Sequence, residues 1–509
     1  MTIALVKLFA TRSFVIGLVG KNHFHSGPCF LLSSKRHSTS DDNTFLKTSD
    51  GSNKTSLLWV RTCLRISDNE ALAKAIEYGQ DGMSVVFTWE RGEVPSTPSE
   101  VFECAAAHKL DQKLRSFGNH LKILNVNKGT HNAISAVCTV ISQLQPNTVL
   151  IDTASSETFR DVEDLQSSLL ANEKISNIQL ISIPDNGNLF PIDCAPSALG
   201  RSRSGGRMLR WPTFLSNMNG EPVSLPIPSP TQLPPPLESS HHSEELPLPT
   251  SAGAWAEELL ERWGVVSEEE AIQRAAASEQ ENTNQTSLGN RGFSNKNTKL
   301  SPYLRWGVIS PRQAYHAGVR KRDLLWRDWS HLCYRTVKPL RLGEPVLPFL
   351  DGCCTLITPK LGGDEDSLFT AWCFGRTGAP LVDAGMRQLW HEGWMPRRIR
   401  LIAASCLVEG LGLNWRKGRD WFKYTLIDHD PAINELMWQN AGFCGIDLFY
   451  RGLVWESVGS RDDQDYVNRW ASRDLHLPTS IEKGISSCPP YPCADLLSVA
   501  KTRRQEFQR

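Results

Sequence analysis

Short apolar runs alternate with helical segments between residues 56 and 153, and this alternation limits the possible folds more than any other feature of the chain. The runs with strand character cover residues 56–61, 83–89, 121–126 and 148–153. Consecutive parallel strands need crossover connections such as the helical segments between these runs, and the helices then cover both faces of the sheet. We therefore predict a Rossmann-like α/β domain over residues 55–184.

A proline-rich stretch and a helical region follow this domain. Residues 220–250 are rich in proline, which favours an extended, semi-rigid connector. From Ala254 onward, helical signals dominate. We predict an interdomain connector over residues 185–253, an all-α domain over 254–480 and a tail over 481–509.

The first forty residues contain several basic residues and no acidic residue before Asp41. A basic, serine-containing and acid-poor segment is typical of an organellar transit peptide. We predict that residues 1–54 form a transit peptide and a disordered bridge, which places the protein in a chloroplast or a mitochondrion. A disordered tail with an accidental bias in composition remains the alternative.

The composition argues against several other classes of protein. The 509 residues include 55 basic and 55 acidic side chains, so only a local basic patch could bind nucleic acid. The 13 cysteines include no C-x-x-C pair, which argues against a zinc site and favours a reducing compartment. No apolar run is long and uncharged enough to span a bilayer. We expect neither a metal site nor a membrane partner.

The pair Asp430-Pro431 marks the start of the most informative helix. An acidic N-cap followed by proline at the first helical position is a strong helix start. Asn434 and Trp438 lie four residues apart on the same face as the cap, so one stripe carries a carboxylate, an amide and an indole. The helix predicted after Pro396 carries arginines, and a buried guanidinium needs a carboxylate partner.

Four ordered motifs in the helical region resemble the flavin-binding domain of the photolyase/cryptochrome family. They are G-R-T-G-A-P-L-V-D-A-G-M-R-Q-L at 375–389, G-W-M at 393–395, N-W-R-K-G at 414–418 and D-H-D-P-A-I-N-E-L-M-W-Q at 428–439. W-V-R-T-C-L-R-I-S-D-N-E-A-L at 59–72 resembles the opening of the family's antenna domain. The resemblance implies an α/β Rossmann-like N-terminal domain plus an all-α C-terminal FAD-binding domain. It also implies a possible second antenna chromophore of the folate or deazaflavin type.

The resemblance implies a set of FAD ligands. Hydroxyl and amide groups just before a helix suit a phosphate, so we predict that the flavin pyrophosphate binds Asn297, Thr298, Lys299, Leu300 and Ser301. The same residues also form a good helix N-cap, which remains the alternative. The other predicted ligands are Arg327, Arg397, Arg400, Asp428, Asp430 and Asn434. Among these, Asp428 is expected to pair with Arg400.

The resemblance also implies roles in light-driven chemistry. Trp326 would offer a stacking face for flipped pyrimidines, and Asp323 stands where the family has a glutamate that contacts lesion bases. Asn434 would lie opposite the flavin N5, where a neutral amide tolerates a reduced, anionic flavin better than the aspartate of plant cryptochromes. Trp438 and Trp415 match the first two members of the family's electron relay.

The third relay tryptophan is missing, because no tryptophan occurs between Trp329 and Trp372. Tyr424 or another aromatic residue is the alternative exit from the relay. Two further departures affect the lesion pocket. Arg397 replaces the family's asparagine after G-W-M, and Asn440 replaces the second tryptophan of the W-Q-W motif.

Basic residues near these motifs could form a positive rim that contacts DNA phosphates. The candidates are Arg398, Arg416, Lys417 and Arg419. A solvated helix face without a DNA partner is the alternative.

Three functions remain open at this stage. The first, which we favour, is a monomeric, light-driven repair enzyme that acts on damaged DNA without sequence specificity. The second is a cryptochrome-like blue-light photoreceptor without repair activity. The third is a degenerate relative that binds flavin weakly or for structure only.

Overall fold

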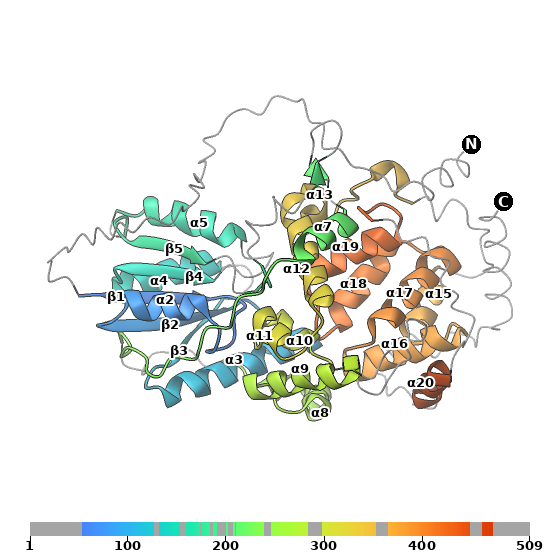
Figure 1. Ribbon diagram of the computed structural model, residues 1–509, viewed down its shortest axis with the longest axis horizontal. Coiled ribbons are helices and arrows are strands. Elements are labelled where there is room, and N and C mark those ends of the chain that lie inside the picture. Colours follow the sequence, from blue (N-terminus) through green and yellow to red (C-terminus); the bar gives the residue numbers. More distant parts are fainter. Residues whose placement is uncertain are drawn as a thin grey trace.

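The structure is a computed structural model. It describes residues 53–126, 132–152, 159–173, 175–183, 187–190, 200–201, 207–208, 210–238, 246–283, 298–352, 365–447 and 461–471. Figure 1 shows an α/β domain and a helical domain lying side by side. Asn297, most of the predicted transit peptide and the predicted C-terminal tail lie outside the described residues.

The N-terminal domain contains a five-stranded parallel sheet with the order β3-β2-β1-β4-β5. The strands are β1 (Thr55–Val60), β2 (Gly82–Trp89), β3 (Leu121–Asn125), β4 (Thr148–Asp152) and β5 (Gln179–Ile183). Successive residues of β1 point to opposite faces, since Leu57 and Trp59 belong to one core cluster and Leu58 and Val60 to another. This arrangement confirms the predicted parallel sheet.

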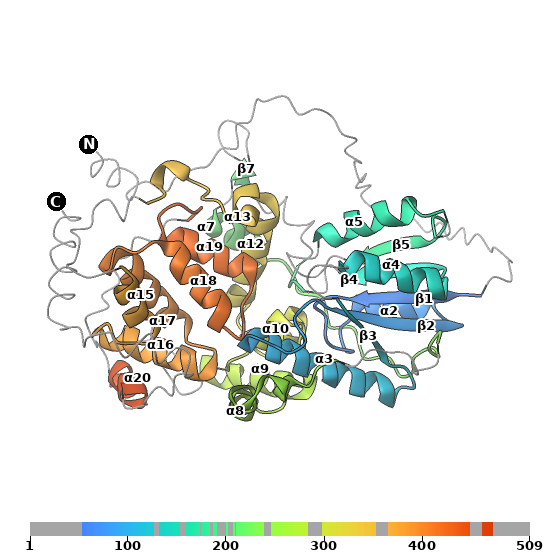
Figure 2. The same ribbon diagram turned by 180° about the vertical axis from the view of Figure 1, so that it is seen from behind.

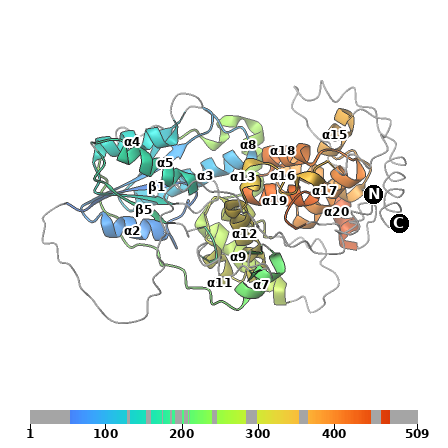
Figure 3. The ribbon, with the colours of Figure 1, turned by 90° about the horizontal axis from the view of Figure 1, so that it is seen from above.

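Helices cover both faces of the sheet, and Figure 3 shows α2 and α4 on opposite sides. The helices of this domain are α2 (Glu70–Tyr78), α3 (Pro98–Ser116), α4 (Ala133–Leu144) and α5 (Phe159–Leu170). Buried residues of α4 and α5 pack in the cluster that contains Leu57 and Trp59, whereas those of α2 and α3 pack in the cluster that contains Leu58. The second cluster also includes residues of the helical domain, so the two domains share a core.

The helical domain confirms the predicted all-α class (Figure 2). The predicted connector contains α7 (Trp211–Asn219) and η3 (Pro249–Ala252). The elements of the helical domain are α8 (Ala254–Trp263), α9 (Glu268–Thr283), α10 (Ser301–Arg305), α11 (Pro311–His316), α12 (Lys321–Thr336), α13 (Lys338–Leu342), η4 (Pro348–Leu350), α15 (Glu365–Cys373), α16 (Pro380–Glu392), α17 (Arg397–Ser405), η5 (Cys406–Gly410), α18 (Trp415–Thr425), α19 (Pro431–Ala441) and α20 (Arg461–Ala471). Two short antiparallel strands, β6 (Gly200–Arg201) and β7 (Arg207–Met208), precede α7. In the part of the chain that the structure describes, no helix is long and apolar enough to cross a membrane.

The predicted connector docks on both domains. Trp211 and Phe214 of α7 pack against the rings of Trp326 and Trp329 on α12. Further along, the backbone oxygen of Pro235 accepts a hydrogen bond from the amide of Met83 in β2 (2.9 Å). The proline-rich segment, which we call the strap, therefore lies along the α/β domain and is hydrogen bonded to it.

One buried carboxylate joins the strap to both domains. Asp68 is fully buried, and its carboxylate accepts hydrogen bonds from the amide of Ile227 (2.8 Å) and from the hydroxyl of Ser310. It also forms an ion pair with Arg312 at 2.8 Å. Removing one partner of a buried ion pair leaves the other charge uncompensated, which costs more than the loss of an exposed pair.

We therefore expect Asp68→Asn to lower the free energy of unfolding by about 3 kcal/mol. Asn tolerates the left-handed backbone conformation at this position (φ +48°), so the decrease in the free energy of unfolding measures the loss of the negative charge and not backbone strain. The matched control is Glu258→Gln, which removes an exposed pair with Arg262 and should cost less than about 1 kcal/mol. Chemical denaturation of the full chain measures both values, and equal losses would show that Asp68 does not tie the domains together.

Candidate functional site

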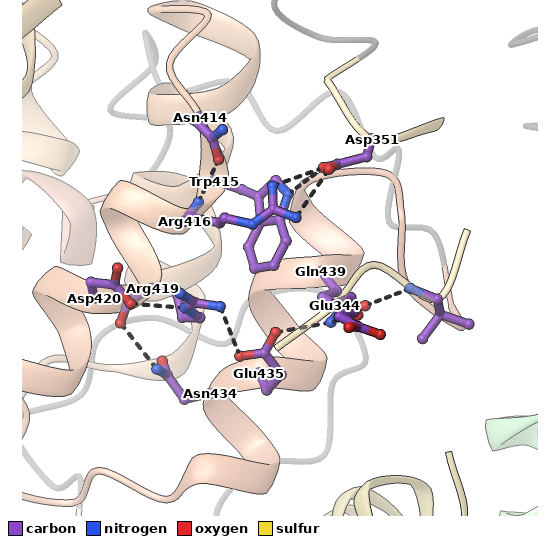
Figure 4. A network of polar contacts seen from close by, with 11 residues as sticks. Glu344, Asp351, Asn414, Trp415, Arg416, Arg419, Asp420, Asn434, Glu435 and Gln439 are labelled. Atoms are coloured by element: carbon purple, nitrogen blue, oxygen red, sulfur yellow. Dashed lines mark hydrogen bonds and ion pairs between the residues drawn. The ribbon is translucent and has the colours of Figure 1, made fainter. Parts of the chain in front are cut away.

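Asp430, Asn434 and Trp438 lie in the core of the helical domain on one face of α19, as the sequence predicts. All three side chains are buried. Asp430 is the N-cap of α19, and its carboxylate accepts hydrogen bonds from the amides of Ala432 (3.0 Å) and Ile433 (3.1 Å). The Nδ2 of Asn434 donates to the backbone oxygen of Arg419 at 3.1 Å (Figure 4).

His331 connects Asp430 to the chain segment that follows the α/β domain, a role that the sequence does not indicate. Its Nε2 lies 2.8 Å from Asp430 Oδ2, and its Nδ1 lies 3.0 Å from the side-chain amide of Asn188. Burial lowers the pKa of His331, although Asp430 opposes this shift, so we treat the ring as neutral with Nε2–H donating. The Nδ2 of Asn188 has no partner among the described residues, and rotation of that amide by 180° lets it donate to Nδ1.

Asp430 remains ionised in this environment. Burial alone raises the pKa of Asp430, but the hydrogen bond from His331 and the positive charges of Arg305 and Arg327 outweigh it and hold that pKa well below its usual range. The carboxylate therefore carries a fixed negative charge at the N-terminus of α19, where the helix dipole also favours it.

Arg327 and Asp328 of α12 hold the chain segment that follows the α/β domain. Arg327 is buried and donates to the backbone oxygens of Gly187 and, at 3.3 Å, of Leu304. Asp328 accepts hydrogen bonds from the amides of Leu189 and Phe190, each at 3.1 Å. In this structure Arg327, a predicted cofactor ligand, fixes the backbone beside the site.

A second cluster surrounds Asp428. The predicted pair is present, with Arg400 Nη2 at 2.7 Å from Asp428 Oδ2, and Ser301 donates to the same oxygen at 2.5 Å. The indole N–H of Trp394 donates to the hydroxyl of Ser301 at 3.0 Å. The other oxygen, Oδ1, is buried and has no partner among the described residues, so it can accept a hydrogen bond from a bound molecule. This open acceptor is the feature of the cluster that fits a flavin, which carries N–H and hydroxyl donors.

The predicted pyrophosphate segment leads directly into this cluster. Lys299 adopts a left-handed conformation (φ +47°) and pairs with Glu392 at 2.8 Å. Its ammonium group lies over the rings of Trp263 (5.5 Å) and Trp394 (5.7 Å). Leu300 is the N-cap of α10 and makes no side-chain capping bond. Thr298 precedes this turn and is partly buried.

The ring of Trp326 is in contact with other side chains. The guanidinium of Arg397 lies 4.6 Å from its ring centroid, and the ring of Trp211 packs edge-on at 4.8 Å. Trp326 is only 7% exposed, which matters because a stacking platform must be accessible. Asp323 lies at the surface in an ion pair with Arg320 at 2.6 Å. Asn440 is fully buried and accepts a hydrogen bond from the amide of Asp447, so it provides no stacking face.

The two predicted relay tryptophans lie where α18 meets α19. A Cβ atom on Gly418 of α18 would lie 2.1 Å from the Trp438 ring, and one on Gly442 would lie 2.4 Å from Trp415. These glycines allow both indoles to pack closely between the helices. Trp438 also contacts Trp372 at a centroid distance of 6.1 Å, a neighbour that the motif comparison did not reveal.

All four basic residues predicted to contact DNA have carboxylate partners. The pairs are Arg398 with Asp463 (2.6 Å), Arg416 with Asp351 (3.0 Å), Lys417 with Asp366 (3.2 Å) and Arg419 with Asp420 (2.8 Å). Their charges are therefore largely compensated within the protein, and contact with DNA stays a prediction. In the described ranges, no group of three or more His, Cys, Asp or Glu side chains is arranged to hold a metal ion.

Comparison with known proteins matches both domains. Residues 56–202 match a family model described as DNA photolyase, and residues 320–484 match one described as the FAD binding domain of DNA photolyase. The chain is 28% identical to the deoxyribodipyrimidine photo-lyase of Agrobacterium fabrum, over 81% of this chain and 86% of that protein. It is 29% identical to cryptochrome-2 of Arabidopsis thaliana, over 84% of this chain and 72% of that protein.

Stronger identity is confined to a shorter region. The chain is 37% identical to the deoxyribodipyrimidine photo-lyase of Thermus thermophilus, over 42% of that protein. Among solved structures, a class III photolyase from Agrobacterium tumefaciens has the same fold, with a TM-score of 0.69, 24% identity and coverage of 91% of this chain and 99% of that chain.

The fold, the buried cluster around Asp428 and the two matched models together define a two-domain flavoprotein whose cofactor is FAD. The chain belongs to the photolyase/cryptochrome family. Since relatives named photolyase and relatives named cryptochrome both match, membership does not decide between repair and light sensing.

The neutral state of His331 predicts a pH dependence. Because burial lowers its folded-state pKa, the stability it contributes is fully present above the unfolded pKa of about 6.5 and is lost as the pH falls toward the lower folded value. We expect acidification from about pH 7.5 to about pH 5 to destabilise the wild type more than His331→Gln. Unfolding midpoints at both pH values, with flavin retention measured in parallel, provide the test. An identical pH dependence in both proteins would contradict a neutral, buried His331.

Proposed function

We propose that this protein is an FAD-dependent, blue-light-driven DNA repair protein of the photolyase type. The observation that carries the proposal is the buried face of α19, where a neutral amide, Asn434, lies between the ionised Asp430 and the indole of Trp438. A neutral side chain at that position favours a fully reduced flavin, the redox state that repair requires.

The residues of the site would divide the work as follows. Arg400 and Asp428 would bind and orient the cofactor. Asp430, which caps α19, would hold that helix in place beside it. Bound, reduced FAD supplies an electron when excited by blue light, and the electron splits a pyrimidine dimer and then returns. Trp326 would stack against the flipped bases after the guanidinium of Arg397 moves off its face.

A photoreceptor without repair activity is the second candidate, and specific contacts favour it. Arg397 covers Trp326, Asn440 is buried in place of a stacking tryptophan, and the basic rim is internally paired. Losing one aromatic partner costs about 1–3 kcal/mol per base, which weakens but does not abolish lesion binding.

The proposed partner is damaged DNA, bound without sequence specificity by a monomer. We also propose import into a chloroplast or a mitochondrion, because the first forty residues are basic and lack acidic residues before Asp41. Fusing residues 1–54 to a fluorescent protein tests the second point, and a diffuse cytosolic signal would argue against it.

The full-length protein, purified with its flavin and chemically reduced, should remove cyclobutane dimers from UV-damaged DNA in blue light and not in darkness. Light-dependent repair would establish a photolyase and show that Arg397 and Asn440 are tolerated in the lesion pocket. Flavin binding without repair would favour the photoreceptor, and absence of flavin would favour the degenerate relative.

If Trp326 is the stacking platform, Trp326→Ala should weaken binding to dimer-containing DNA by about tenfold or more. Flavin content should not change. The control is Trp255→Ala, which removes a partly exposed tryptophan from α8. Equal affinities of Trp326→Ala and wild type would show that the bases stack elsewhere.

Replacing Trp438 with Phe should slow photoreduction of oxidised flavin, because phenylalanine is much harder to oxidise than tryptophan. The spectroscopic rate under steady blue light is the measurement, and Trp89→Phe in the α/β domain is the control. An unchanged rate in Trp438→Phe would mean that another donor, such as Trp372, takes its place.

A further inference from the structure

The indole of Trp415 is hydrogen bonded to a carboxylate. Its Nε1–H donates to Asp351 Oδ1 at 3.0 Å, and Figure 4 shows the two groups directed toward each other. Trp415 is 3% exposed, so this N–H has little access to solvent. Asp351 follows η4, outside all the motifs that carry the family resemblance.

Asp351 is an ionised acceptor with access to water. It forms an ion pair with Arg416, whose guanidinium nitrogens lie 3.1 Å and 3.0 Å from the two carboxylate oxygens. Burial raises the pKa of Asp351, but the hydrogen bonds from Arg416 and Trp415 outweigh it, so the net pKa is below the ordinary value. Its side chain is about a quarter exposed (25%), which gives a proton on this carboxylate a route to solvent.

A positive charge on the Trp415 ring would be costly without this carboxylate. The ring is buried, and the guanidinium carbons of Arg416 and Arg419 lie 4.5 Å and 5.3 Å from its centroid. An indole that loses an electron becomes a cation with an acidic N–H. A buried charge is tolerated only when it is paired or neutralised, and Asp351 can do both.

The missing third tryptophan suggests a function for the hydrogen bond between Trp415 and Asp351. With no tryptophan between Trp329 and Trp372, the usual next donor after Trp415 is absent. An oxidised Trp415 would then take its electron back quickly unless another step removes its charge. Loss of the indole proton is such a step, since return of the electron would require return of the proton.

We propose that Asp351 accepts the indole proton of Trp415 after an electron has moved from Trp415 to oxidised Trp438, which has given its own electron to photoexcited FAD. The N–H bond of Trp415 breaks, an O–H bond forms on Asp351, and a neutral indolyl radical remains. This assignment rests on the proposed flavin photochemistry, but it does not depend on DNA repair.

Transient absorption of the full-length, FAD-loaded protein tests the proposal, because the cationic and neutral tryptophan radicals have different spectra. In the wild type we expect the neutral radical, formed at a rate that slows in deuterated water. Asp351→Asn keeps the shape but is a very weak base. It should slow formation of the neutral radical by about tenfold or more, as expected for loss of a charge-assisted hydrogen bond. Asp351→Glu keeps a carboxylate and should form the neutral radical faster than Asp351→Asn.

Matched variants separate proton acceptance from simple structural support. Arg416→Gln removes the ion pair and keeps the carboxylate, so the neutral radical should still form. Asp366→Asn removes an exposed acid paired with Lys417 and should have no effect. Flavin content and unfolding midpoints confirm that each variant is folded.

Two outcomes would overturn the assignment. Either Asp351→Asn forms the neutral radical at the wild-type rate, or Arg416→Gln loses it to the same extent as Asp351→Asn. If the flavin-loaded wild type forms no tryptophan radical at all, the proposed flavin photochemistry is wrong. That result differs from a wild type that forms the radical without needing Asp351, so failure of the photochemistry can be told apart from failure of the Asp351 assignment.

Discussion

The ionised carboxylate of Asp430 is the interaction on which the candidate site depends. It caps α19 through two backbone amides and accepts a hydrogen bond from His331, which in turn contacts Asn188 from the segment after β5. A carboxylate buried this deeply is tolerated only when each lone pair is used. Satisfying one charge therefore fixes α12, α19 and the exit of the α/β domain relative to one another.

The sequence reveals those parts of the structure that depend on local periodicity. Strands β1 to β4 lie within one residue of the predicted runs, and the proline after Asp430 correctly places the start of α19. Strand β5 was not identified, because it lies at the edge of the sheet and its side chains are mostly solvent-accessible. A continuous apolar run is expected only of strands buried on both faces.

Contacts between residues distant in sequence could not be predicted in the same way. The need of a guanidinium for a carboxylate left Asp428 and Asp430 as candidate partners, and only the family resemblance assigned Asp428 to Arg400, as the structure shows. His331 and Asn188 are 143 positions apart, and no pattern in the sequence relates them. The contacts of Asp351 with Trp415 and of Arg397 with Trp326 likewise depend on how helices pack, which periodicity does not specify.

The two leading functions share one half of the site and differ in the other. Flavin photoreduction would depend on α18 and α19 in both proposals, and Gly418 and Gly442 let the indoles of Trp438 and Trp415 pack closely there. In the repair proposal, lesion binding would depend on Trp326 of α12, and the guanidinium of Arg397 from α17 lies over that ring. A cation–π contact is worth about 0.5–1 kcal/mol at an exposed site and about 2 kcal/mol when desolvated, and the Arg397 side chain is exposed, so a flipped base can displace the guanidinium at a cost in this range. The same displacement would place a positive charge beside the DNA backbone, where it gains a phosphate partner. The covered Trp326 is therefore compatible with repair, and the loss of the second stacking wall at Asn440 is the stronger argument against it.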